Sequence, residues 1–245
     1  MRFQYKMKWT ELILTIRMLL IFIIALIVGC TPKVIKMDDA TKGSLSRAQQ
    51  ITAIHYIHPV FEMPSYSTSG GAIGGLISGI IARSQGERLE EKFGLHDPIL
   101  HVKEKFLSTV LNEFPSLKIS QMSAPLENDD VHDLKGQFSK GYILDFQTRR
   151  WGIVKHIEGW EYLKPSGSDR RKAKFLGRAR LIDPSKKSIL WQGICDLEDS
   201  NIFTMEDVKY WYPGEDNNLE GLFKILGFRC VKELVEQFTN TLPSQ

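Results

Sequence analysis

Three cysteines have the clearest chemical potential in this sequence, and each stands in a different setting. Cys30 follows an unbroken apolar run, MLLIFIIALIV over residues 18–28, and a small residue, Gly29. Cys195 ends the apolar stretch SILWQGIC, and Cys230 lies among leucines near the C-terminus. A thiol can be acylated, cross-linked or used in redox chemistry, and the lack of a Cys-x-x-Cys pair disfavours the last of these. We therefore expect acylation or cross-linking.

The segment around Cys30 resembles the lipobox of bacterial lipoproteins. Its apolar run is shorter than the ~20 residues that span a bilayer, and it follows a basic flank, as in a secretory signal peptide. The flank contains Arg2, Lys6, Lys8 and Arg17, with one acid, Glu11. In that family the cysteine thiol is diacylated, the chain is cut before it, and acyl chains such as palmitate hold the protein on a membrane.

The resemblance implies a lipoprotein signal peptide over residues 1–29 and a lipidated Cys30. Residue Thr31 follows the cysteine, and the lack of Asp there implies the cell outer membrane, with the domain facing the periplasm. The alternative is a signal anchor that keeps its apolar helix.

Charge gives no support for nucleic-acid binding. The chain has 32 basic and 29 acidic residues. Without the four basic residues and the one acid of the leader, the two totals are equal, so the mature chain is formally neutral. A nucleic-acid-binding protein usually carries an excess of basic residues. Separately, no motif in the sequence predicts a cofactor.

Cys195 and Cys230 form an even pair for an oxidising compartment. Cys195 ends an apolar strand, and Cys230 lies on an apolar stripe of a C-terminal helix, with Leu222, Leu226 and Leu234. A disulfide would join the helix to the strand and stabilise the fold by ~2–4 kcal/mol. The alternative is two buried free thiols.

The remaining pattern predicts one α/β domain over residues 51–242, after a polar lipidated tether over residues 30–50. Helices are expected from the glycine-rich stretch to Gly94, from Asp97-Pro98 to Pro115, and over residues 218–238, where apolar residues recur on one face. Residues 127–137 are expected to be a loop. Strands are expected over residues 51–61, 117–122, 142–155, 174–183 and 188–197, which gives a mostly antiparallel sheet with a helical layer.

One hairpin carries a second resemblance. The segment RARLIDPSKKSILWQG places a tight turn between two strands, with a tryptophan after the turn. It is similar to hairpins of envelope lipoproteins of the curli-secretion type and the TolB N-terminal type. The resemblance implies an assembly or interaction module and not an enzyme.

The stretch GGAIGGLISGIIA places Gly71, Gly75 and Gly79 four residues apart, as in a glycine zipper. Such spacing lets another backbone approach a helix closely, whereas each glycine costs a helix in water ~1 kcal/mol relative to alanine. Three interpretations stay open: a packing seam within the protein, a contact with another copy or with the membrane, or a mobile loop.

The aromatic cluster Tyr210, Trp211 and Tyr212 precedes the last helix. Exposed aromatic rings can stack on sugars or enter a partner's pocket, and peptidoglycan is the nearby glycan. The alternative is that Trp211 closes one end of the core. A basic hairpin tip, Asp169, Arg170, Arg171, Lys172 and Lys174, could contact anionic lipid headgroups or be a solvated turn.

Metal and catalytic patterns are weak. His55 and His58 lie three apart and would face opposite sides of a strand, and the spacing of His96 and His101 suits one site poorly. The loop with Asp129, Asp130, His132 and Asp133 could hold a cation loosely, but it lacks the pattern of a calcium loop. No nucleophile elbow, zinc-protease motif or phosphate loop is present.

The sequence therefore predicts a non-catalytic outer-membrane lipoprotein of the cell envelope, with no metal site. Its expected partners are the membrane, through the anchor, and either another envelope protein or a second copy of the chain. A peptidoglycan or glycan binder is the first alternative, and a hydrolase around His156 and Glu158 is the last.

Overall fold

A computed structural model describes residues 33–45, 50–63, 71–113, 115–138, 141–155, 170–204 and 219–240, together with Arg17 and Asp207. The chain divides into two units, Met1–Lys33 and Val34–Gln245, and the second contains the elements described below. Across the part that is described, no helix has both the length and the apolar character needed to cross a membrane. The rest of the predicted signal peptide and Cys30 lie outside the described residues.

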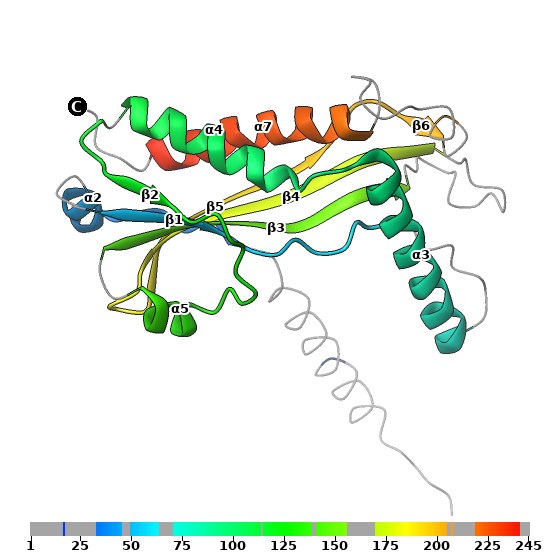
Figure 1. Ribbon diagram of the computed structural model, residues 1–245, viewed down its shortest axis with the longest axis horizontal. Coiled ribbons are helices and arrows are strands. Elements are labelled where there is room, and N and C mark those ends of the chain that lie inside the picture. The colour runs from blue at the N-terminus through cyan, green and yellow to red at the C-terminus, as the bar shows by residue number, and fades with distance from the viewer. Residues whose placement is uncertain are drawn as a thin grey trace, which may run out of the picture. The chain divides into compact units, whose positions relative to one another are not determined.

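A mixed sheet forms the centre of the second unit (Figure 1). Its six strands have the order β2-β1-β3-β4-β5, and β6 pairs with β4. β1 is parallel to β2 and β3, and the other pairs are antiparallel. The strands are β1 Ile51–His55, β2 Ile119–Gln121, β3 Tyr142–Lys155, β4 Arg170–Asp183, β5 Ser188–Glu198 and β6 Phe203–Thr204. The prediction of an α/β domain with a mostly antiparallel sheet is confirmed.

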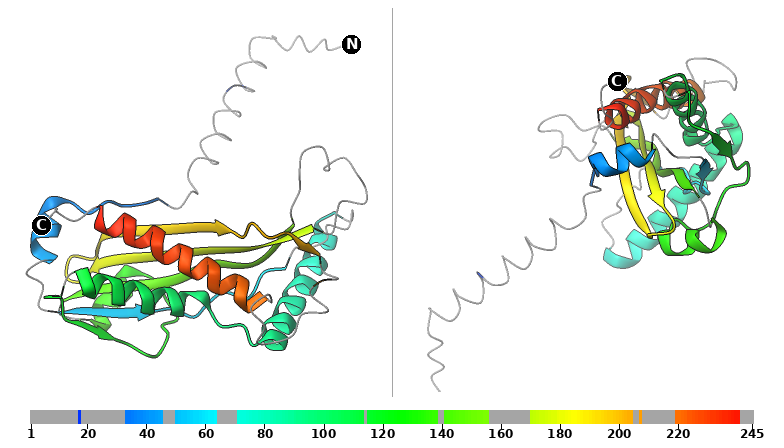
Figure 2. Two further views of the ribbon diagram at one scale, coloured as in Figure 1. Left: turned by 90° about the horizontal axis from the view of Figure 1, so that it is seen from above. Right: turned by 90° about the vertical axis from the view of Figure 1, so that its left-hand side faces the viewer.

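Two long helices, α4 Pro98–Glu113 and α7 Leu219–Thr239, cover one face of this sheet (Figures 1 and 2). They run side by side in the same direction, because Pro98 lies near Gly227 and Phe106 packs against Phe238. The other described helices are α2 Asp39–Leu45, α3 Gly71–Phe93 and α5 Val131–Gln137. α5 lies on the opposite side of the sheet from α4 and α7 (Figure 1).

Alternation along the strands separates two cores. On β4, Phe175, Ala179 and Leu181 point toward α4 and α7 and join the main core. Ile182 faces the other way and joins a smaller core with Ile54, Tyr56, Leu134 and Ile143. The large core explains the length of α4 and α7, since an amphipathic face that packs on a sheet supplies most of a helix's stability.

Capping determines where α4 begins. The Asp97 carboxylate accepts a hydrogen bond from the backbone N–H of Ile99 at 3.0 Å, and Pro98 occupies the first helical position, as expected. α3 ends at Phe93 and is followed by Gly94 with φ +58°, a conformation that glycine adopts easily.

The expectation of a loop over residues 127–137 is wrong, because Val131–Gln137 is the helix α5. Asp130 caps it by accepting a hydrogen bond from the N–H of His132. The helix is short and lacks a repeated apolar stripe, but it buries Leu134 in the smaller core. Tertiary burial therefore provides what the local pattern lacks.

The boundary between tether and domain also needs correction. Within the stretch expected to be a tether, Ile35 exchanges two backbone hydrogen bonds with Gln192 on β5, and Met37 and Leu45 are buried in the main core. Residues 34–45 thus belong to the domain. The first strand is shorter than predicted, because β1 ends at His55.

Candidate functional site

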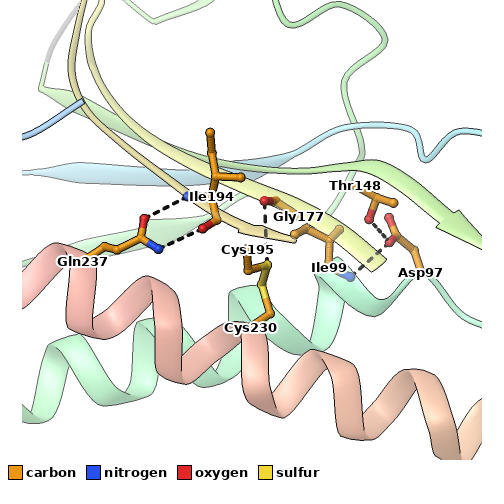
Figure 3. Close-up of a disulfide and its surroundings, with 8 residues drawn as sticks. All are labelled: Asp97, Ile99, Thr148, Gly177, Ile194, Cys195, Cys230 and Gln237. Carbon is orange, nitrogen blue, oxygen red and sulfur yellow. Dashed lines mark hydrogen bonds between the residues drawn. A yellow bond between two sulfur atoms is a disulfide. The ribbon is translucent and has the colours of Figure 1, made fainter. Parts of the chain in front are cut away.

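A disulfide joins β5 to α7, as predicted (Figure 3). The bond links Cys195 to Cys230, with Cα atoms 5.3 Å apart and both residues fully buried. Gly177 on β4 leaves the space that the bond needs, because a Cβ there would lie 2.9 Å from the Cys195 Sγ. Next to the disulfide, the side-chain amide of Gln237 accepts a hydrogen bond from the Ile194 N–H and donates one to the Ile194 carbonyl. α7 is therefore fixed to the edge strand at two adjacent points.

A cavity of about 330 Å³ lies where α4 and α7 begin. Its apolar lining consists of Leu95, Pro98, Leu100 and Phe223. Its polar lining consists of His96, Asp97, His101, Glu104, Glu220 and Lys224. Ligand pockets commonly combine an apolar surface with a few polar groups, so this cavity is the candidate functional site in the described part of the chain.

Asp97 is the buried acid of the cavity. It is 7% exposed, and its Oδ1 accepts hydrogen bonds from the Ile99 N–H and the Thr148 hydroxyl (Figure 3). Burial raises the pKa of Asp97 above its ordinary value, although these two hydrogen bonds act in the opposite direction. Its first role is structural, because it holds the start of α4 against β3.

Helical spacing determines how the other lining residues face the cavity. Glu220, Lys224 and Phe228 recur every four residues along α7 and so share one side of that helix. Leu100 and Glu104 have the same spacing on α4. Phe228 lies outside the lining, but its ring packs edge-to-face with the ring of the lining residue His101 on α4, with centroids 4.4 Å apart.

Two exposed apolar residues border the cavity, and we call them the apolar rim: Leu100, which lines it, and Phe228, whose ring contacts His101. They are 39% and 48% exposed. Exposed aliphatic and aromatic residues that gather beside a cavity are typical of an interaction surface. The rim and the cavity together can bind a group that is partly apolar.

The glycine-rich stretch is helical, because α3 begins at Gly71 and includes Gly75 and Gly79. A loop at these three residues is therefore wrong. What they contact lies outside the described side chains, so the seam and the external contact both stay open. Farther along α3, Gly86 rests on the chain at Phe61, and a Cβ there would lie 2.1 Å from the Phe61 carbonyl oxygen.

The expected basic hairpin tip is largely strand. β4 already begins at Arg170, Arg171 is 1% exposed, and Lys174 forms ion pairs with Asp196 and Glu198. A contact between this whole group and lipid headgroups is therefore not available. Asp169 lies outside the described residues.

The candidate metal ligands have other partners. His55 Nδ1 lies 3.2 Å from the Lys103 Nζ, and His58 Nε2 lies 3.6 Å from Glu90. Asp129 pairs with Arg178 and Arg149. Among the residues that the structure describes, no group of three His, Cys, Asp or Glu side chains could hold a metal ion.

Other predicted residues lie outside the described ranges: Tyr210, Trp211, Tyr212, His156 and Glu158. The cavity itself was missed by sequence reasoning. The four-residue spacing of Glu220, Lys224 and Phe228 was visible in the sequence, but only the packing of α4 beside α7 places it next to Leu100 and Glu104.

No family model matches this sequence, and no curated protein matches it. Solved structures similar to the chain include the PelC dodecamer from Paraburkholderia phytofirmans, with 9% identity over 87% of this chain and 97% of that one, and a TM-score of 0.36. Lipoprotein GNA1162 from Neisseria meningitidis has 14% identity, coverage of 76% and 98%, and a TM-score of 0.32. Protein CT253 from Chlamydia trachomatis has 9% identity, coverage of 77% and 94%, and a TM-score of 0.35. Structural similarity at such low identities and TM-scores gives no information about function.

Proposed function

We propose that this chain is an envelope lipoprotein, anchored in the bacterial outer membrane through acylated Cys30, whose periplasmic domain is a non-catalytic assembly or interaction module. The observation that carries the compartment is the buried disulfide between Cys195 and Cys230. Disulfides persist in oxidising spaces such as the periplasm and are rare in the cytosol. The disulfide thus supports the compartment that the leader and Cys30 imply.

The proposed interaction role is supported by the cavity and the apolar rim. A lipid anchor holds a protein at a surface but gives it no specificity, so a partner must be bound by the domain. The helix α7, which carries Phe228, is fixed to the sheet through Cys230 and Gln237. The start of α4, which carries Leu100, is held against β3 by the hydrogen bond between Thr148 and Asp97. A surface on fixed helices loses little conformational entropy when it binds.

The test is replacement of Cys30 by serine in the full-length chain. The Cys30→Ser variant should move from the membrane fraction to the soluble fraction and lose radiolabelled palmitate, because serine offers no thiol for acylation. The wild-type protein should separate with outer membranes on a density gradient. As a matched control, Cys195→Ala/Cys230→Ala removes the other two cysteines and their disulfide but should leave the protein acylated and membrane-bound.

Retention of Cys30→Ser in the membrane would contradict lipid anchoring and would indicate a retained signal anchor or a contact of the glycine-rich helix with lipid. Binding of a glycan would contradict the proposed assembly role of the domain. If the wild-type protein binds soluble muropeptides and the Trp211→Ala variant does not, the domain is a glycan-binding module.

A further inference from the structure

The charged residues of the α4–α7 cavity and the apolar rim beside it indicate which kind of partner can bind there. Taking the proposed interaction role as its basis, we infer that this surface binds a short cationic and apolar peptide segment of a partner protein, with a lysine or arginine side chain in the cavity and an apolar side chain on the rim.

The charge of the lining supports a cationic side chain. Glu104 and Glu220 are exposed carboxylates on opposite walls, and Lys224 is the cation of the lining. Asp97 adds a third acid at the back of the cavity. Acids therefore outnumber the cation even when the buried Asp97 is protonated.

His101 in the lining does not reverse this balance near neutral pH. Burial lowers the pKa of His101, and the charges of Lys105 and Lys224 act in the same direction, while Glu104 opposes them. His101 is therefore uncharged at pH 7 and packs as a ring against Phe228. A ligand cation would meet a site with net negative charge, which favours its binding and speeds its approach.

The position of the rim supports an apolar neighbour to that cation. Two of the six large hydrophobic residues that are exposed in the described part of the chain, Leu100 and Phe228, lie beside the acidic cavity. Burial of these two side chains by a partner would stabilise a complex.

Size and charge favour a peptide over a lipid surface. A volume of about 330 Å³ is at the lower end for ligand pockets and suits one or two side chains. Membrane surfaces in bacteria carry anionic headgroups, and basic residues attract them. Exposed Glu104 and Glu220 would instead repel such a surface, while they complement a basic peptide.

The experiment uses the mature full-length lipoprotein in neutral detergent and three fluorescent peptides of equal length. One alternates leucine with lysine, one alternates leucine with glutamate, and one alternates serine with lysine. Fluorescence anisotropy should show that the Leu–Lys peptide binds about tenfold more tightly than either of the others, because both its charge and its apolar side chains contribute to binding. Added salt should weaken its binding, because salt screens the exposed charges.

Variants assign this binding to the cavity. Glu104→Gln/Glu220→Gln should weaken binding of the Leu–Lys peptide by about tenfold, since it removes both exposed carboxylates that would pair with the cation of the peptide. Leu100→Ser/Phe228→Ser should weaken it at least as much. The matched control Glu91→Gln/Glu236→Gln removes two exposed glutamates from α3 and from the far end of α7 and should leave the affinity unchanged. Thermal melting shows that each variant is folded.

The inference is overturned if Glu104→Gln/Glu220→Gln binds the Leu–Lys peptide as the parent does, or if the Leu–Glu peptide binds equally well. It is also overturned if soluble Cys30→Ser protein binds phosphatidylglycerol vesicles and Leu100→Ser/Phe228→Ser abolishes that binding, because the rim would then contact lipid. These results leave the lipoprotein proposal intact, since acylation and fractionation through Cys30 test it separately.

Discussion

The two faces of the sheet are held to their covering elements by different forces. On the face under α4 and α7, Phe106, Phe238 and Trp191 pack ring against ring, and the disulfide adds a covalent link. On the face near α5, a buried cluster joins Tyr56, Asp145 and Arg180. The Tyr56 hydroxyl donates to Asp145 at 2.7 Å, and the Arg180 guanidinium donates to the same carboxylate at 2.6 Å.

This cluster also holds the loop before α5. Arg180 donates a second hydrogen bond to the backbone carbonyl of Asp129, and the Asp129 carboxylate pairs with Arg178. Burial of Arg180 would by itself lower its pKa, but the charge and hydrogen bonds of Asp145 raise it. Burial and the neighbouring Asp145 charge likewise raise the pKa of Tyr56, which therefore stays protonated.

The difference shows how each face responds to change. When apolar atoms are removed from a packed core, the free energy of unfolding falls in proportion to the number of atoms removed. When one member of a buried ion pair is removed, the other charge stays buried without a partner, and the free energy of unfolding falls by more than the lost contacts suggest. The helix-covered face should therefore tolerate changes of charge nearby, and the α5 face should not.

The largest effect is expected for Asp145→Asn. This change keeps the shape of the side chain but leaves the Arg180 cation buried without its counter-charge, so the free energy of unfolding should fall by about 3–5 kcal/mol. Urea unfolding measures the loss. The control is Asp196→Asn, on a pair with Lys174 in which Asp196 is 56% exposed, where at most about 1 kcal/mol is expected. Equal losses in the two variants would show that the buried cluster does not hold the α5 face.

The second largest loss of stability is expected on the face covered by α4 and α7, where the disulfide is removed. Cys195→Ala/Cys230→Ala removes the cross-link over a sequence separation of 35 residues and should lower the free energy of unfolding by about 3–4 kcal/mol. Wild-type protein unfolded with a reductant should lose the same amount, and the double variant should be insensitive to the reductant. If the wild-type protein also unfolds at the same urea concentration with and without reductant, non-covalent contacts hold α7 without help from the disulfide.

The elements that could be predicted from sequence are those with local signals. The cap at Asp97-Pro98 determines the start of α4, and the strand expected over residues 142–155 matches β3 in full. In both cases a few neighbouring residues contain the whole signal. The pairing of Cys195 with Cys230 followed from the even pair of cysteines and from the apolar stripe that places Cys230 toward the sheet.

What could not be predicted depends on contacts between distant segments. Tyr56 and Asp145 are 89 residues apart, and Arg180 is a further 35 residues along the chain. Arg178 and Arg180 alternate with apolar residues on β4 and therefore read as a solvent-facing row, yet they are 9% and 4% exposed. They are buried because the loop that contains Asp129 packs over this part of the sheet. No local pattern in the sequence predicts the position of that loop.

The smallest effect concerns a buried polar contact on the face covered by α4 and α7. His55 on β1 faces Lys103 on α4, and both are buried. Burial, and then the charge of Lys103, lower the pKa of His55 below its ordinary value of 6.5. The folded state thus resists a proton that the unfolded state accepts, so the free energy of unfolding should decrease as pH falls from 7 through 6.5 toward 5.

The variant His55→Gln keeps a polar partner for Lys103 and cannot take up that proton. Urea unfolding between pH 7 and 5 should give a shallower decrease for His55→Gln than for wild type, with a difference smaller than either of the preceding losses. Asp97 and His101 titrate in both proteins, so their contributions cancel in the comparison. A wild-type slope in His55→Gln would mean that the contact between His55 and Lys103 gives the helix-covered face no pH sensitivity.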